Sequence, residues 1–233
     1  MDLAMHMSDG LVNAPTAAAF GAVAVLGLAV SVYRARADLD DRTAPMAGLV
    51  TAFVFAVQMI NFPILPGASG HLLGGALVAI LVGPWVGSLC IAIVLVVQAL
   101  LFADGGLTAL GTNIVNMALV GVFVGWGVAV ALRPLARRSR TGLLVTAFTA
   151  AFVNTVVASL AFVLEYAIGG AAGASLGTVF TLMVGFHALI GIGEGLITAA
   201  TVGAVAAVRP DLIYLLRDTA APLELRTATG SAQ

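Results

Sequence analysis

Apolar positions follow one another in long runs that short polar or glycine- and proline-rich breaks interrupt. A helix crosses a hydrocarbon core about 30 Å thick with roughly 20 mainly apolar residues, so runs of this length predict membrane spans. The clear runs are 14–33, 44–62, 71–102, 109–132, 141–165 and 178–208. Composition agrees, with 61% hydrophobic and 9% charged residues, against about a quarter charged in soluble domains. The pattern predicts an all-α membrane protein embedded in a lipid bilayer.

The run 71–102 is too long for one ordinary span and carries Gly83-Pro84-Trp85 near its middle. Proline lacks a backbone donor and disfavours helical geometry at the residue before it. The run is therefore either one kinked helix or two helices, 71–82 and 85–102, that turn back on each other.

The arginines distinguish these two possibilities, because basic residues collect in cytoplasmic loops. All ten basic residues are arginines and fall in three clusters: Arg34, Arg36 and Arg42; Arg133, Arg137, Arg138 and Arg140; Arg209, Arg217 and Arg226. Two helices in 71–102 put all three clusters on one side. The prediction is seven transmembrane helices with the N-terminus outside and the C-terminus inside. Residues 1–208 would form the transmembrane domain and 209–233 a cytoplasmic tail.

The predicted third helix, 71–82, is short. It rises only about 18 Å at 1.5 Å per residue. The non-helical stretch 62–70 before it must therefore dip below the outer membrane surface, and such backbone survives only buried in protein or lining a wet cavity. This places His71 at the floor of an outward cavity, on the same side as His6.

Two of the three histidines could share a metal ion. The chain begins Met1-Asp2-Leu3-Ala4-Met5-His6. A free terminal amine, the next backbone nitrogen and a histidine ring can chelate one ion in a plane, and His71 could complete that plane. Planar nitrogen ligation favours Cu(II) or Ni(II), with Co(II) next. The alternative is a solvated His6 and a His71 that caps a helix. A net charge of −1 and the lack of a basic stripe argue against a nucleic-acid partner.

Several short segments together match a known family. They are Met5-His6-Met7-Ser8-Asp9-Gly10, Gln58 to Pro63, Ser69-Gly70-His71-Leu72-Leu73-Gly74-Gly75, Gln98 to Gly106, Asn113 to Met117, and His187 to Glu194. With these segments the chain resembles the membrane substrate-binding (S) component of energy-coupling-factor transporters for cobalt and nickel. The resemblance runs through nearly the whole chain, and the segments are specific as a set.

The resemblance implies seven helices, an N-terminus folded back into the bundle, and a metal held by Met5, His6 and His71. It implies capture of Co²⁺ or Ni²⁺ outside a prokaryotic plasma membrane, in a protein that is not an enzyme and has no prosthetic group. The implied partners are a coupling transmembrane subunit and ATPase subunits, with a small accessory membrane subunit as a further candidate. The delivered metal would feed cobalamin synthesis. The nitrogen ligands do not distinguish cobalt from nickel.

Four residues precede Met5, and a peptide-bonded Met5 nitrogen cannot act as an amine ligand. The expectation is that the mature chain begins at Met5, through the start of translation or removal of residues 1–4.

Other polar residues lie within the apolar runs. His187, Gly191 and Glu194 share one helix face by their spacing, so His187 is a candidate partner for the Glu194 carboxylate. Asn113 and Asn116 also share a face and could support the metal loop.

Small residues also repeat every four positions on the second predicted helix, at Gly48, Ala52 and Ala56. Such a stripe permits close helix approach. It either packs inside this chain or docks the coupling subunit.

Two other functions compete with metal capture. Gly67-Ala68-Ser69-Gly70 matches the Gly-x-Ser-Gly of intramembrane serine proteases, with Ser69 as nucleophile and His187 as base. The second alternative is a stand-alone metal carrier, but carriers place ionisable residues along a path through the membrane, whereas these ligands gather on one side. The chain has no lysine and hence no Walker-type loop, so ATP-driven uptake would need an ATPase from other subunits.

Overall fold

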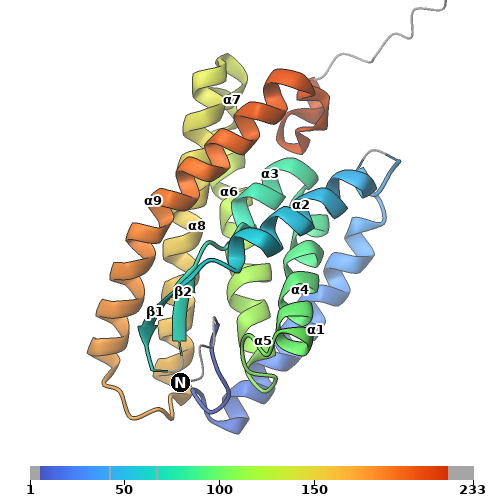
Figure 1. Ribbon diagram of the computed structural model, residues 1–233. Coiled ribbons are helices and arrows are strands. Elements are labelled where there is room, and N and C mark those ends of the chain that lie inside the picture. The colour runs from blue at the N-terminus through green and yellow to red at the C-terminus, as the bar shows by residue number, and fades with distance from the viewer. Residues whose placement is uncertain (1–5, 42, 67, 220–233) are drawn as a thin grey trace, which may run out of the picture.

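The computed structural model describes residues 6–41, 43–66 and 68–219 as a bundle of helices (Figure 1). Five helical segments in this part are long and apolar enough to cross a membrane. They are α1 (Ala14–Ala35), α4 (Pro84–Leu101), the continuous segment Leu110–Ala131, α8 (Arg140–Gly169) and α9 (Leu176–Val208). The prediction of a mainly helical membrane protein is confirmed. The number of seven crossings stays a prediction, because α2 (Thr43–Gln58) and α3 (Gly75–Val82) are shorter.

The predicted break in the third apolar run is present. Helix α3 ends at Val82 and α4 begins at Pro84. Gly83 between them has φ +86°, a left-handed conformation that glycine adopts without steric strain. The two helices then pack against each other so closely that a Cβ on Gly87 would lie 2.8 Å from Val78 Cγ2. The run is therefore a helical hairpin and not one kinked helix.

The stretch before α3 is a two-stranded antiparallel hairpin, β1 (Asn61–Leu65) and β2 (Ala68–His71). Three predictions were wrong here. The second helix ends at Gln58 and not at 62, the third begins at Gly75 and not at 71, and the fold is not purely helical. His71 is the last residue of β2, where it pairs with Asn61. The hairpin thereby pairs backbone groups of the two strands with each other.

Helix α3 forms the centre of the bundle. All eight of its residues are buried, and a helix that is apolar on every side is expected inside a structure and not at its surface. Helices α2, α4, α6 (Val122–Ala131), α8 and α9 pack around it. The hairpin that carries His71 is thus fixed directly to the most buried element of the fold.

The described arginine clusters gather at one end of the bundle, as predicted. Figure 1 shows α7 (Arg133–Arg138) and the C-terminal ends of α1 and α9 at the top, and the beginning of the chain at the bottom. The short helical turns Pro210–Leu212 and Tyr214–Thr219 follow α9. They pack onto the bundle, with Ile213 and Leu215 fully buried. Tyr214 Oη donates to Asp38 Oδ1 at 2.8 Å.

Candidate metal centre

The segment that begins at His6 runs into the bundle, so the fold-back that the resemblance implied is present. His6 and Met7 are 4% and 1% exposed. The Asn113 side chain clamps the Met7 backbone, because its Oδ1 accepts from Met7 N and its Nδ2 donates to Met7 O, both at 3.1 Å. Gly106 N also donates to Met7 O at 3.0 Å. These contacts confirm Asn113 as a support for the site and fix where His6 can lie.

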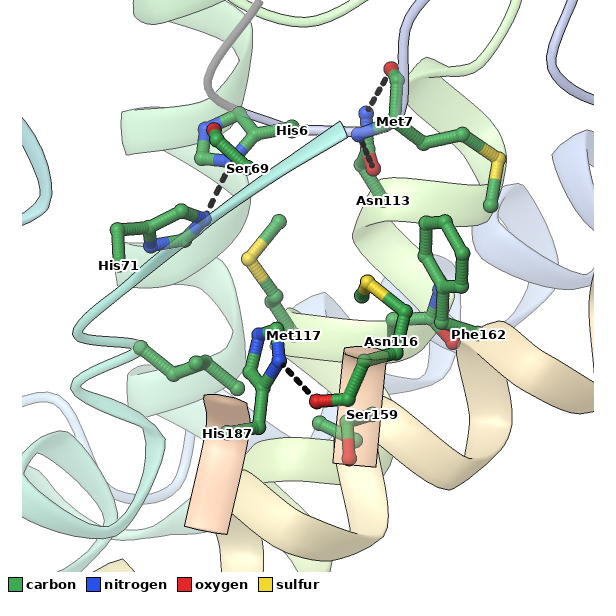
Figure 2. Close-up of a pocket in the computed structure, with 13 residues that line it drawn as sticks. His6, Met7, Ser69, His71, Asn113, Asn116, Met117, Ser159, Phe162 and His187 are labelled. Atoms are coloured by element: carbon green, nitrogen blue, oxygen red, sulfur yellow. Dashed lines mark hydrogen bonds between the residues drawn. The ribbon is translucent and has the colours of Figure 1, made fainter. Parts of the chain in front are cut away.

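The structure brings His6 and His71 together although 65 positions separate them in sequence. His6 Nδ1 lies 2.6 Å from His71 Nε2, and the two rings meet edge to face with their centroids 4.4 Å apart. Figure 2 shows the dashed contact between the two rings, one from the N-terminal segment and one from the end of β2. Both side chains are almost completely buried. The pairing predicted from two scarce histidines is therefore geometrically real.

The outer nitrogen of each ring contacts a carbonyl oxygen, which fixes the tautomer. A carbonyl oxygen can only accept, so His6 Nε2–H donates to Gln98 Oε1 at 2.9 Å and His71 Nδ1–H donates to Leu72 O at 2.9 Å. In the neutral rings the two facing nitrogens then carry lone pairs and no proton. Two lone pairs this close repel each other unless a cation lies between or beside them. Histidines that bind metals have this arrangement, with the second ring nitrogen held by a carbonyl or carboxylate.

The separation of the facing nitrogens also suits a shared ion. Imidazole nitrogens bind first-row metals at about 2.0 Å, so two nitrogens at right angles around one ion lie about 2.8 Å apart. The observed 2.6 Å is close to that value and far from the roughly 4 Å of ligands on opposite sides. The distance between the two rings is thus compatible with neighbouring positions around one ion.

Two residues near His6 were not predicted as parts of the site. Gln98 read as a polar residue that links helices, yet its Oε1 orients the His6 ring. Asp104, 3% exposed, lies with Oδ2 4.0 Å from His6 Nε2 and places a carboxylate beside the outer nitrogen of this ring. Gly105, with φ +81°, leaves room for the ring, since a Cβ there would lie 3.2 Å from His6. No short motif contains Gln98 and His6 together, so spacing could not reveal their contact.

A cavity of about 40 Å³ extends from the two rings into the bundle (Figure 2). His187 of α9 and Asn116 of the π-helical segment Ile114–Gly121 line it with His6 and His71. π-helical turns recur at functional sites, and this one displays Asn116 towards the cavity. The third histidine of the chain therefore faces the same space as the other two.

The prediction that His187 partners Glu194 was wrong. His187 Nδ1–H donates instead to Met183 O at 2.7 Å. Glu194 binds the loop that follows His71, where Leu73 N and Gly74 N donate to its two oxygens at 2.7 and 3.0 Å. His187 and Glu194 share one face of α9, but each contacts different residues. Spacing along a helix shows which residues share a face and does not show which residues they contact.

Glu194 is saturated with donors. Thr155 Oγ1 and Asn154 Nδ2 of α8 also donate to it, at 2.8 and 3.0 Å, so that each carboxylate oxygen accepts two hydrogen bonds. A carboxylate inside a membrane protein is stabilised by such a complete set of partners. The carboxylate ties the loop between β2 and α3 to helices α8 and α9, and thereby holds His71 in place.

The predicted ligand Met5 lies outside the described residues. Within the described part of the chain, no group of three or more histidine, cysteine, aspartate or glutamate side chains is arranged to hold a metal. His6 and His71 are the two predicted ligands that the structure describes.

The sequence comparison decides the family. Residues 6–212 match the family described as the cobalt uptake substrate-specific transmembrane region. The chain belongs to this family. It is a multi-pass membrane protein of a prokaryotic plasma membrane and a member of a cobalt and nickel transport family.

Individual relatives agree with this assignment. The chain is 40% identical over 228 residues to an Archaeoglobus fulgidus protein provisionally named fused nickel transport protein NikMN, covering 98% of this chain and 73% of that one. It is 32% identical over 220 residues to the cobalt transport protein CbiM of Sorangium cellulosum, covering 91% and 96%. A crystal structure described as a truncated transition metal transporter matches with a TM-score of 0.81 at 29% identity, over 87% of this chain and 99% of that chain.

Proposed function

We propose that this protein captures Co²⁺ or Ni²⁺ from outside the cell, with His6 Nδ1 and His71 Nε2 as neighbouring ligands. The observation that carries the proposal is the pair of facing ring nitrogens, 2.6 Å apart, with each ring oriented by a carbonyl on its far side. Nitrogen ligation suits both ions. Backbone nitrogen and the Met5 amine complete the coordination plane in a mature chain that begins at Met5.

The proposal includes an orientation. The chain would cross the membrane seven times, with the His6 end outside and the arginine-rich end inside, in accord with the side on which basic residues collect. The ion then enters from outside into a site closed by the folded-back N-terminal segment. Residues 209–233 form the inner tail.

Delivery into the cell would need partners. A coupling transmembrane subunit and ATPase subunits, and a small accessory membrane subunit, would form an ATP-driven uptake complex with this chain and supply metal for cobalamin synthesis. The small-residue stripe of α2 is available for docking, since Gly48, Ala52 and Ala56 are all exposed. Their packing inside this chain, the other interpretation of the stripe, is therefore wrong. Replacing Ala52 and Ala56 by leucine should weaken assembly of the complex.

The test of metal capture is a calorimetric titration of the purified protein with Ni²⁺ and Co²⁺, after intact-mass measurement has defined its N-terminus. His6→Ala and His71→Ala should each lose tight binding, because each removes one ligand. Thr141→Ala, an exposed change on the first turn of α8, is the control and should bind like the wild type. Tight binding by both histidine variants would contradict the proposal. A retained Met1 would remove the Met5 amine from the ligand set.

The serine protease alternative gains no support from the geometry. Ser69 and His187 line the same cavity, but His187 Nδ1 is engaged by Met183 O and the described residues include no hydrogen bond between Ser69 and His187. A nucleophile needs its base within hydrogen-bond reach. Ser69→Ala should keep full metal binding. The relatives, moreover, are named as transport proteins.

A further inference from the structure

The third histidine repeats the arrangement of the two proposed ligands. In all three, one ring nitrogen donates to a carbonyl oxygen: Gln98 Oε1 for His6, Leu72 O for His71 and Met183 O for His187. The nitrogen left over in neutral His187 is Nε2, which carries a lone pair. No described residue forms a hydrogen bond with it. All three histidines thus have one ring nitrogen held by a carbonyl oxygen, and all three line one cavity.

His187 is poorly explained as a packing residue. Its side chain is 95% buried, since its exposed fraction is 5%, on a helix that crosses the bundle. Ionisable side chains inside a membrane are expensive and mark ion pathways by default. Figure 2 shows its ring pointing towards the side of the cavity where Met117 and His71 lie.

A second polar residue, Asn116, lines the same cavity. Asn116 lines the cavity and is 5% exposed, and its Oδ1 is buried with no hydrogen-bond partner. The orientation of this amide is set from behind, because Nδ2 donates to Glu165 Oε2 at 2.7 Å. A buried carbonyl oxygen without a donor is unfavourable unless water or a cation satisfies it. Asn116 Oδ1 is such a group, and His187 lines the same small cavity from another element.

The remaining lining adds compatible chemistry. The side chains of Met117 and Met183 border the cavity, and thioether sulfur is a further soft ligand for transition metals. The volume of about 40 Å³ exceeds the 10–15 Å³ or so that one water needs, so an ion with a water ligand fits. Nitrogen, oxygen and sulfur donors around such a volume suit the ions that the family transports.

We propose that His187 Nε2 and Asn116 Oδ1 form a second binding position for the transported ion, deeper in the cavity than the His6–His71 pair. This inference rests on the proposed function, because it assumes that Co²⁺ or Ni²⁺ enters at the first position. The second position has fewer nitrogen ligands and binds the ion more weakly. An ion released from His6 and His71 would find ligands there before it leaves the bundle.

The test uses the full chain with the first position removed. In the double variant His6→Ala/His71→Ala, equilibrium dialysis against Co²⁺ should still give one bound ion per chain, at least tenfold weaker than in the wild type, with its own visible absorption spectrum. Adding His187→Ala should abolish this binding. His187→Gln, which keeps a hydrogen-bonding side chain of similar size, should do the same, and thermal unfolding in detergent checks that each variant is folded.

Two results would overturn the second position: no Co²⁺ bound by the folded double variant, or the same binding with and without His187. The proposed function fails on a different result, namely wild-type affinity in the double variant. Asn116→Ala in the double variant should weaken binding of the remaining Co²⁺ ion and alter the visible absorption spectrum of that ion. An unchanged spectrum would remove Asn116 from the ligand set.

Discussion

Two buried polar clusters share helices α8 and α9, and they differ in how completely their polar groups are hydrogen-bonded. In the Glu194 cluster, each carboxylate oxygen accepts two hydrogen bonds from loop backbone and from α8. In the histidine cavity, each imidazole is held at one nitrogen by a carbonyl oxygen, and the buried Oδ1 of Asn116, which also lines this cavity, has no hydrogen-bond partner. Because every oxygen of Glu194 has its hydrogen bonds, the first cluster serves as a structural anchor. Because the polar groups of the second cluster lack a full set of hydrogen bonds, a cation can bind there.

The comparison also separates the roles of the two clusters. The anchor holds the loop after His71 by backbone donors at Leu73 and Gly74, and so acts on the metal site from a distance. The cavity residues would touch the ion. Changes in the cavity should therefore affect metal affinity most, and changes in the anchor should affect stability and affinity together.

The largest effect is expected from His71→Ala. If a binding free energy of about 10–16 kcal/mol is shared by four ligands, each accounts for roughly 2.5–4 kcal/mol. Losing one ligand then weakens Ni²⁺ binding on the order of a hundred- to a thousandfold. Calorimetric titration measures this, with thermal unfolding of the metal-free variant as the control for folding. A change of less than tenfold would mean that His71 is not a ligand.

Acidification should have the next largest effect, and only on the cavity. A metal and a proton compete for the same lone pair, so each imidazole ligand must be neutral. An unperturbed imidazole titrates near pH 6.5. Two such imidazoles would lose roughly thirtyfold in affinity between pH 6.5 and 5.5. Burial lowers the pKa of His71 well below its usual value, so the loss should be smaller than this. Binding that strengthens as the pH falls from 7.5 to 5.5 would contradict imidazole ligation.

The contact that holds the N-terminal segment depends on pH in a different range from metal binding. Asp9 Oδ1 accepts from Thr108 N and Oγ1 at 2.8 and 2.6 Å, and the Thr108 hydrogen bond lowers the pKa of Asp9 below its usual value. A lowered pKa contributes stability that is present above the unfolded value of about 3.9 and is lost only as the pH falls through the folded one. This contact therefore survives at pH 5.5. It does not contribute to the decline in affinity expected near pH 6.

Glu194→Gln should give a moderate effect on both properties. A glutamine amide turns its NH₂ towards two of the four donors, and each buried donor left without an acceptor costs about 1–3 kcal/mol. The unfolding temperature in detergent should fall by several degrees, and metal affinity about tenfold, because outer residues that orient ligands have effects of this size. The visible spectrum of bound Ni²⁺ should shift as His71 moves.

The matched control for this change is Glu165→Gln on α8. Glu165 accepts one hydrogen bond, from Asn116 Nδ2, and the amide oxygen of glutamine can still accept it. The unfolding temperature should therefore change less than in Glu194→Gln. Equal destabilisation by the two changes would contradict the distinction between a saturated anchor and an incompletely satisfied cavity.

The smallest effect is expected from Asp9→Ala. This exposed side chain ties the N-terminal segment to Thr108, while Asn113 continues to hold Met7. Nickel affinity should fall only a few-fold, through faster dissociation of the ion measured by stopped-flow chelator competition. A loss as large as that of His71→Ala would place the main ligands nearer to Asp9 than proposed.

The helices were largely predictable from the sequence, because an apolar run long enough to span a membrane can adopt few structures other than a helix. The break at Gly83-Pro84 was predictable because proline excludes one continuous helix. The β1–β2 hairpin was not, since its strands are short and Pro63, Pro66 and Gly70 are typical of irregular loops. Its pairing depends on α9, whose Ile190 packs against the hairpin close to Gly70.

The proximity of His6 and His71 was predictable from the sequence, whereas most residues that orient them were not. His6 and His71 were found because histidine is scarce in so apolar a chain and each lies beside a predicted outer surface. Gln98, and the four donors of Glu194, come from elements that no motif joins. Only tertiary packing brings Gln98 of α4 to His6 and brings Glu194 of α9 to α8 and to the loop after His71.

A crystal structure of the Co²⁺-loaded protein, with anomalous scattering measured at the cobalt edge, tests the proposed metal site most directly. The predicted result is an anomalous peak about 2 Å from both His6 Nδ1 and His71 Nε2, with Gln98 Oε1 and Leu72 O still holding the outer nitrogens. A peak that lies away from this pair, or that contacts only one of the two imidazoles, would contradict the account.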